Sequence, residues 1–222
     1  MEQHILTMGN YRLACQLPQQ AVRQLVYFHS PVDDLTPPED LLEQAGAAFL
    51  CITGEDWNAD LTPWPAERVF AKGGDFGGRA DRYLRVLTEE LLPFAEHSLH
   101  AEGLPRTLAG VSLSGLFAVY AAHRTDAFHR ICSVSGSLWY DGFLDFMVQN
   151  PVSPAVRRVY LSVGSREKNA KNPRMRRVED CTLRAAGRLR QQDVDTRMEI
   201  NPGGHYADGA ERLRKGLTNI LA

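Results

Sequence analysis

Several features that would direct this chain to particular classes of protein are missing from its sequence. No uninterrupted apolar run approaches the roughly 20 residues that a membrane-spanning helix needs. No basic segment followed by an apolar one stands at the start, so a secretory signal peptide is not expected. Lys and Arg number 25 against 27 Asp and Glu, without the basic excess of a dedicated nucleic-acid-binding protein. We therefore expect a cytoplasmic protein that binds neither membranes nor nucleic acids.

Cysteine is also scarce. The chain has four cysteines, widely spaced and without a C-x-x-C pair. Three of them lie in apolar, strand-like segments, where free buried thiols are expected. The sequence therefore predicts neither a metal site nor a cofactor. One basic stretch, residues 166–177, is interrupted by Glu167, Asn169 and Pro173, and we interpret it as a loop and a solvated helix face, with anion binding as the lesser alternative.

The order of apolar segments predicts an α/β protein. Short β-rich runs alternate with helical patterns, which is typical of a mostly parallel central sheet covered by helices on both faces. The expected strands are residues 11–17, 24–29, 47–53, 107–111, 130–135, 157–163 and 196–200. A length of 222 residues without an evident linker suits a single domain over residues 1–222.

Helices are expected over residues 79–97 and 113–123, from residue 172 onward, and from about residue 208 to the end. Pro93 should end or kink the first of these helices. Asn172 is a good N-cap, and Asp208 with Glu211 forms a pattern like a capping box. About twenty residues separate the strands ending near 135 and starting near 157, which leaves room for one helix but for no large cap domain. We therefore expect an open site.

The strongest local motif is the segment Gly110-Val111-Ser112-Leu113-Ser114-Gly115, between a strand and a helix. A serine on such a sharp turn holds its hydroxyl above the sheet, where it can act as a nucleophile. The second glycine of the usual G-x-S-x-G pattern is Ser114 here. Ser114 is the weaker alternative nucleophile, because it falls within the first turn of the helix. We predict Ser112 as the nucleophile.

A serine needs a base, which in this arrangement follows the last strand. His205 stands there, directly after two glycines. The acid that orients the histidine should follow the strand near residues 157–163, and Glu167 is the carboxylate in that place. Asp193 and Asp195 are the alternatives. The sequence thus predicts Ser112, His205 and Glu167 as a catalytic triad.

Two backbone N–H groups should hold the oxyanion that forms during acyl transfer. Leu113 N–H, at the start of the helix, is one expected donor. The second should come from the loop after the strand 24–29. Pro31 has no N–H to donate, so Ser30 and Val32 both stay open as the second donor.

Several motifs together resemble the esterase branch of the α/β-hydrolases, which includes the enterobactin (siderophore trilactone) esterases and S-formylglutathione hydrolase. The resemblance covers most of the chain from about residue 25, and its motifs are DLTP at 60–63, GGRADRYL at 77–84, TEELLPF at 88–94, LAGVSLSGLFA at 108–118, SGSLWY at 135–140 and PGGH at 202–205. It implies the α/β-hydrolase fold and catalytic roles for Ser112 and His205. It also implies that Trp139 and Tyr140 lie near the substrate. Ser114 and the Ser30-Pro31 pair depart from the family pattern.

Ester hydrolysis through an acyl-enzyme is the function that these residues favour, with a small-molecule ester as the partner. Aromatic residues near the site, with Trp57 or Trp64 as further candidates, would suit an aryl, bulky acyl or siderophore-type ester. Acyl transfer on the same Ser–His pair is one alternative. A hydrolase fold that has lost activity and serves as a binding module is the other. The oligomeric state stays open.

Overall fold

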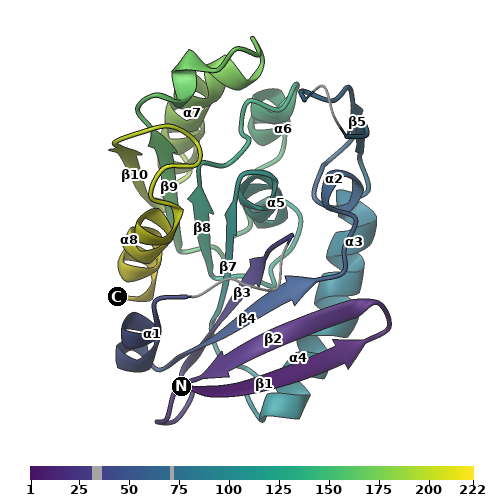
Figure 1. Ribbon diagram of the computed structural model, residues 1–222, viewed down its shortest axis with the longest axis vertical. Helices are drawn as coiled ribbons and strands as arrows, with labels where there is room; N and C mark the ends of the chain where they lie inside the picture. Colours follow the sequence, from purple (N-terminus) through teal and green to yellow (C-terminus); the bar gives the residue numbers. More distant parts are fainter. Residues whose placement is uncertain (32–36, 71–72) are drawn as a thin grey trace.

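An eight-stranded mixed sheet forms the centre of the structure, a computed structural model that describes residues 1–31, 37–70 and 73–222 (Figure 1). In spatial order the strands are β1 (Glu2–Met8), β2 (Tyr11–Leu17), β4 (Ala47–Thr53), β3 (Gln24–His29), β7 (Arg106–Val111), β8 (Arg130–Val134), β9 (Arg158–Gly164) and β10 (Asp195–Asn201). β2 runs antiparallel to both of its neighbours, and all other adjacent strands are parallel. The expectation of a mostly parallel sheet is confirmed.

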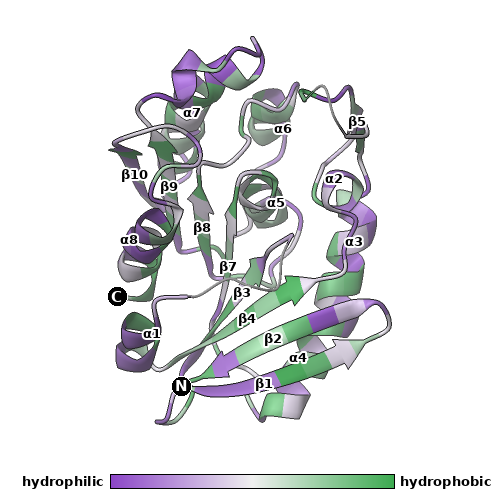
Figure 2. Ribbon diagram, in the orientation of Figure 1, coloured by the Kyte–Doolittle hydropathy of each residue, from purple (hydrophilic) through white to green (hydrophobic). Residues whose placement is uncertain are grey.

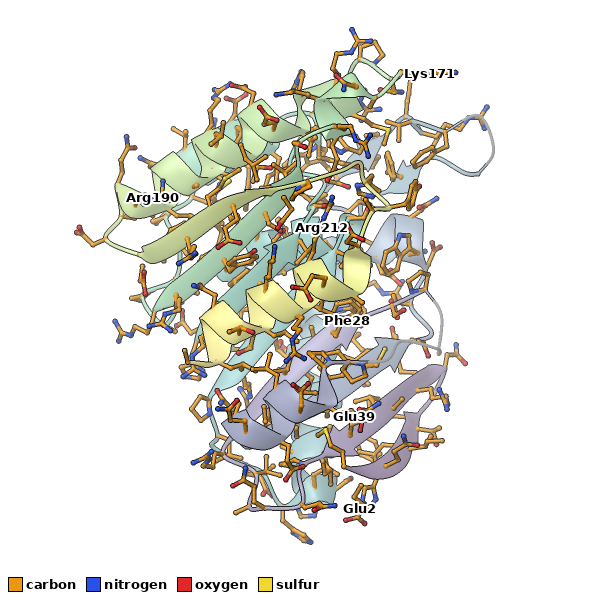
Figure 3. The ribbon with its side chains drawn as sticks, turned by 60° about the vertical axis from the view of Figure 1, so that its left-hand side comes forward. Glu2, Phe28, Glu39, Lys171, Arg190 and Arg212 are labelled. Atoms are coloured by element: carbon orange, nitrogen blue, oxygen red, sulfur yellow. The ribbon has the colours of Figure 1, made fainter. Side chains whose placement is uncertain are left out.

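Helices cover both faces of this sheet, as expected. They are α1 (Glu39–Ala45), α2 (Trp57–Asp60), α3 (Ala80–Val86), α4 (Leu92–Leu99), α5 (Leu113–Ala122), α6 (Phe143–Gln149), α7 (Val178–Arg190) and α8 (Gly209–Leu221). Successive side chains of a strand point to opposite faces. In β3, Leu25 and Tyr27 join the apolar cluster beneath α3, α4, α5 and α7, whereas Val26 and Phe28 join the cluster beneath α1 and α8. Figure 3 shows α1 and α8 together in front of the sheet, with Phe28 behind them.

Burial explains why these segments became strands. Every residue of β3 is buried, and so are six of the seven residues of β4. The central strands are accordingly coloured as hydrophobic in Figure 2, whereas α1 and the region above α7 carry hydrophilic residues. Strands covered on both faces read as continuous apolar runs, the pattern from which they were predicted.

Seven strands lie where the sequence predicts them, and three of these have the same bounds. The sequence did not reveal β1, whose residues alternate between exposed and half-buried at the edge of the sheet. A two-residue turn joins it to β2, with Gly9 at a positive φ of 58°. The short strands β5 (Pro65–Ala66) and β6 (Phe76–Gly77) were also missed, because two-residue strands leave no periodic signal.

Three helix boundaries differ from those expected. The helix does not end at Pro93, because a π-helical turn over Leu87–Leu91 leads directly into α4. The helix expected from residue 172 onward becomes α-helical only at Val178, after a 3₁₀ turn over Met175–Arg177. Asn172 Oδ1 accepts the N–H of Arg174 at 2.9 Å, just before that turn. Asp208 precedes α8 but does not cap it, because its backbone is left-handed (φ 50°) and its side chain makes no capping bond.

Candidate active site

Parallel strands end at a common edge of the sheet, and the candidate residues gather there. Ser112 follows β7, Glu167 follows β9, and His205 follows β10. Between β8 and β9 the described chain contains one helix, α6, and no large cap. Ligand sites of open parallel sheets lie outside the carboxyl ends of the strands, so this edge is where a site is expected.

Ser112 stands on a strained turn between β7 and α5. Its backbone has a φ of 59° and a ψ of −119°, a region that side-chain-bearing residues rarely occupy. A Cβ on Gly110 would lie 2.3 Å from the carbonyl carbon of Ser114, so only glycine fits there. Backbone strain of this kind is characteristic of functional sites, and here it presents the Ser112 hydroxyl beside the helix N-terminus.

His205 joins this serine to the candidate acid. Its Nε2 lies 3.2 Å from Ser112 Oγ, and its Nδ1 lies 2.7 Å from Glu167 Oε2. An ionised carboxylate can only accept hydrogen bonds, so we assign the hydrogen to Nδ1, which leaves Nε2 free to accept from the serine. The three predicted residues therefore form one chain of hydrogen bonds.

Glu167 is held by more than the histidine. Its other oxygen, Oε1, accepts the Ser135 hydroxyl at 2.7 Å and the Gly164 N–H at 2.6 Å. Burial by itself would raise the pKa of Glu167. The hydrogen bonds from His205, Ser135 and Gly164 outweigh it and lower the pKa below the ordinary value. The side chain, 4% exposed, is thus kept as a carboxylate at neutral pH.

The alternative candidates lie elsewhere. Asp195 starts β10, at the end of the strand away from His205, and pairs with Arg158 at 2.8 Å. Asp193 stands in the turn just before it. The hydroxyl of Ser114 bonds to the backbone of Val111 instead of the histidine. Geometry therefore favours Glu167 over the aspartates, and Ser112 over Ser114.

The structure describes only part of the oxyanion hole that the sequence predicts. Leu113 opens α5, and the leading N–H groups of a helix have no partner inside it. Ser30 is buried, and its N–H donates to Ile52 O at 3.2 Å, so in this conformation that N–H continues the sheet ladder. Val32 lies outside the described residues. A second donor from this loop stays a prediction.

A cavity of about 280 Å³ opens over the serine. Its lining is largely apolar and aromatic, with Trp57, Val69, Phe70, Phe76, Trp139 and Met175 beside Ser112, Leu113, Ser137 and His205. Arg68, Asn58, Gly73 and Gly74 also line it. Much of the described wall therefore comes from residues between β4 and α3.

The aromatic residues singled out by sequence have different positions. Trp139 lines the cavity and packs under the Arg174 guanidinium, 5.5 Å from the ring centroid. Tyr140 is buried, and its hydroxyl donates to Trp64 O at 2.6 Å. The described part of the cavity wall includes Trp57 but neither Tyr140 nor Trp64. Tyr140 therefore supports the wall from behind.

A second cavity of about 250 Å³ adjoins the first. Trp139, Met175 and His205 line both cavities. The second is otherwise lined by Arg166, Glu167, Asn169, Ala170, Val178 and Tyr206. His205 thus borders both cavities, the first of which also contains Ser112.

Among the described residues, no group of three or more His, Cys, Asp or Glu side chains is placed to hold a metal ion. No helix in the described ranges is both long and apolar enough to cross a bilayer. All four cysteines are buried, and they are not joined in disulfide bonds.

The protein has an α/β-hydrolase fold with the geometry of a serine hydrolase. This class is defined by the order of the strands, by the turn at the serine and by the contacts among Ser112, His205 and Glu167. The family described as "Putative esterase" matches residues 9–209. The chain belongs to this esterase family. The resemblance seen in the sequence is thereby confirmed.

Known structures have the same fold. An IroE-like serine hydrolase from Shewanella oneidensis is 18% identical, with a TM-score of 0.79 over 98% of this chain and 79% of that one. Siderophore hydrolase EstA from Aspergillus nidulans is 18% identical, with a TM-score of 0.76 over 100% and 95%. Enterobactin esterase FES from Shigella flexneri is 20% identical, with a TM-score of 0.72 over 98% and 58%. At these identities the similarity establishes the fold.

The uncharacterized protein YbbA of Bacillus subtilis is similar in sequence. It is 30% identical over 136 residues, which are 60% of this chain. The match spans about half of YbbA, 54% of its length.

Sequence reasoning missed two residues that touch Glu167. Ser135, at a positive φ of 48°, directly follows β8. Arg212 comes from α8, and its guanidinium is buried beside the same carboxylate. One signal for Arg212 was available, since it is spaced four and eight residues from the buried positions Gly216 and Ile220 and so lies on the inner face of the helix.

Proposed function

We propose that this chain hydrolyses carboxylic esters through a covalent acyl-enzyme. The observation that carries the proposal is the unbroken chain of hydrogen bonds from Ser112 Oγ through His205 to Glu167. Ser112 Oγ attacks the acyl carbon while His205 Nε2 takes the hydroxyl proton. The C–O bond to the leaving alcohol then breaks, and the alcohol receives that proton. Water, activated by the same nitrogen, attacks the acyl-enzyme and releases the acid and the free serine.

The other groups act on charges that appear during these steps. Glu167 accepts from Nδ1–H, keeps the imidazole in the productive tautomer and stabilises the imidazolium. Leu113 N–H and the positive end of the α5 dipole would stabilise the oxyanion as it develops, since α5 begins at Leu113 directly after the serine. Loop residues after β3 would supply the second donor.

The proposed substrate is an ester with an aryl or bulky apolar acyl group. The cavity beside Ser112 supports this choice, because aromatic rings and aliphatic side chains form most of its wall. The second cavity offers space for the alcohol on the other side of His205. Two of the similar structures are named as siderophore and enterobactin hydrolases, which makes siderophore-type esters a natural part of the panel to test.

Replacing the nucleophile tests the mechanism. Ser112→Ala should abolish both hydrolysis of a p-nitrophenyl ester and labelling by a fluorophosphonate probe. Ser98→Ala, which changes an exposed serine on α4, should leave both unchanged. Continued labelling of Ser112→Ala would contradict the assignment. A folded wild-type protein that neither hydrolyses esters nor reacts with the probe would point to a binding module.

A panel of esters tests the substrate class. With a constant p-nitrophenyl leaving group, kcat/KM should rise from acetyl to phenylacetyl and longer apolar acyl groups. Trp139→Ala should reduce this preference more than it reduces hydrolysis of the acetyl ester, because it removes wall area that only the larger group contacts. A preference for acetate in the wild type would contradict the proposal. Adding an alcohol acceptor and measuring ester products would reveal acyl transfer.

A further inference from the structure

Arg212 is a charged residue in a place where the fold would accept an apolar one. It lies on the first turns of α8, and its side chain is 2% exposed (Figure 3). Its neighbours on the helix, Leu213 and Leu217, pack in the apolar cluster against the sheet. Burying a guanidinium is costly, and an apolar side chain of similar size often stabilises such a position at least as well. Packing alone therefore does not explain this arginine.

Its hydrogen bonds join three loops at the carboxyl edge of the sheet. Nη1 donates to Ser135 Oγ, after β8, at 3.2 Å, and lies 3.4 Å from Glu167 Oε1, after β9. Nη2 donates to Pro202 O, after β10, at 2.6 Å. Pro202 stands three residues before His205. One planar group thus contacts the acid, a donor to the acid, and the loop that presents the base.

Gly164, at the end of β9, leaves room for this guanidinium. A Cβ on Gly164 would lie 2.8 Å from Nη2, 2.9 Å from Nη1 and 2.6 Å from the carbonyl oxygen of Gly203. The end of β9, the guanidinium and the loop before His205 are therefore packed closely against one another.

We propose that Arg212 is a positioning residue, which sets the distance and orientation between Glu167 and His205. This inference rests on the function proposed above. The two oxygens of Glu167 have separate partners, since Oε2 faces the histidine while Oε1 receives Arg212, Ser135 and Gly164 N–H. Arg212 holds the carboxylate against rotation, and its charge favours the ionised form in a buried site. Through Pro202 it also fixes the loop that carries the imidazole.

Two substitutions at Arg212 and a matched one on the same helix test this role. Arg212→Met keeps length and apolar volume without the charge, whereas Arg212→Lys keeps the charge without the planar fork. Arg214→Met is the control, because Arg214 pairs with Asp40 at the surface, at 2.6 Å and away from the site. Each protein is assayed for kcat and KM on a p-nitrophenyl ester, and for the pH dependence of kcat/KM.

For Arg212→Met we expect kcat to fall on the order of 10- to 100-fold, with KM changed less than about threefold, because misplacement affects the transition state more than binding. The acid limb of the pH profile should move to higher pH, since the hydrogen-bonded Glu167–His205 pair takes up a proton more easily without the neighbouring positive charge. Arg212→Lys should restore the acid limb but only part of kcat. Arg214→Met should match the wild type.

Other results would overturn the inference. The inference is wrong if a folded Arg212→Met variant keeps the wild-type kcat and the wild-type acid limb. It is also wrong if the substitution changes only KM. If Arg212→Met does not fold, Arg212→Lys decides, and wild-type kcat in that variant excludes a positioning role. A wild-type protein without hydrolysis or Ser112 labelling would overturn the proposed function itself, and this inference with it.

Discussion

Ser114 Oγ lies 2.8 Å from both the backbone nitrogen and the carbonyl oxygen of Val111, so one hydroxyl accepts from and donates to the same peptide residue. This residue takes the place of the second glycine in the usual G-x-S-x-G turn. The turn is tight enough to need glycine at Gly110, where a Cβ would collide with the backbone of Ser114. At position 114 a small side chain fits, and its hydroxyl ties the turn to the end of β7.

Ser114→Ala should therefore destabilise the protein by about 1–3 kcal/mol, because Val111 N–H loses its partner in a buried place. Urea unfolding at neutral pH would measure the loss. Ser98→Ala is the control, since Ser98 bonds to Phe94 O on the exposed face of α4. Equal unfolding midpoints for Ser114→Ala and the wild type would show that the hydroxyl does not hold the turn.

Replacing the candidate acid should affect activity strongly. We expect Glu167→Gln to lower kcat on the order of 10²- to 10⁴-fold, because an amide no longer fixes the tautomer of His205 or stabilises its charge. Steady-state hydrolysis of a p-nitrophenyl ester gives the ratio. Glu89→Gln, at an exposed position of the π-helical turn, should leave kcat unchanged. Full activity in Glu167→Gln would remove Glu167 from the triad.

Glu167 should also make the free energy of unfolding depend on pH in the acid range. Glu167 has a pKa below its ordinary value of 4.5 in the folded protein, so the folded state releases this proton more readily than the unfolded state. The stabilisation is fully present above about pH 4.5 and is lost as pH falls through the lower folded-state pKa. Unfolding free energies between pH 6 and pH 3 should fall more steeply for the wild type than for Glu167→Gln. Parallel curves would contradict this.

His29 should make the free energy of unfolding depend on pH in a higher range than Glu167 does. Burial lowers the pKa of His29 to about 3, and its Nε2 lies 2.8 Å from Tyr83 Oη. The unfolded chain takes up a proton near pH 6.5 that the folded state excludes, so stability falls as pH drops below 6.5. By pH 5 the loss should be about 2 kcal/mol. His29→Gln should lack this part of the slope, and His97→Gln, at an exposed position, serves as the control.

An ion pair between half-buried Arg106, at the start of β7, and buried Glu96 should matter for stability alone. Arg106 lies 2.5 Å from Glu96 Oε1, which also accepts the Tyr27 hydroxyl at 2.9 Å. Arg106→Met should cost about 3–5 kcal/mol, because it leaves the carboxylate buried without its charge partner. Arg124→Met, which breaks an exposed pair with Asp81, should cost at most about 1 kcal/mol. Guanidinium unfolding compares the two, and similar losses would contradict the difference in burial.

The sequence alone determined most strands of the sheet and the positions of the serine and histidine motifs along the chain. Central strands such as β3 and β4 were readable because burial on both faces requires continuous apolar runs. The order strand, serine, helix at Ser112 and the glycines before His205 were readable for a similar reason, since tight turns demand small residues next to the functional one. The edge strand β1 stayed hidden because its half-exposed residues need no such pattern.

Tertiary structure decided the contacts between loops that are distant in the chain. The sequence favoured Glu167 by its position but left Asp193 and Asp195 as alternatives, because the choice depends on which loop ends beside His205 at the edge of the sheet. Arg212 follows His205 by seven residues yet reaches Glu167 and Pro202 only through the packing of α8 on the sheet. Local spacing specifies strands, helices and turns, whereas the hydrogen bonds that link three loops at one edge exist only after the sheet has brought those loops together.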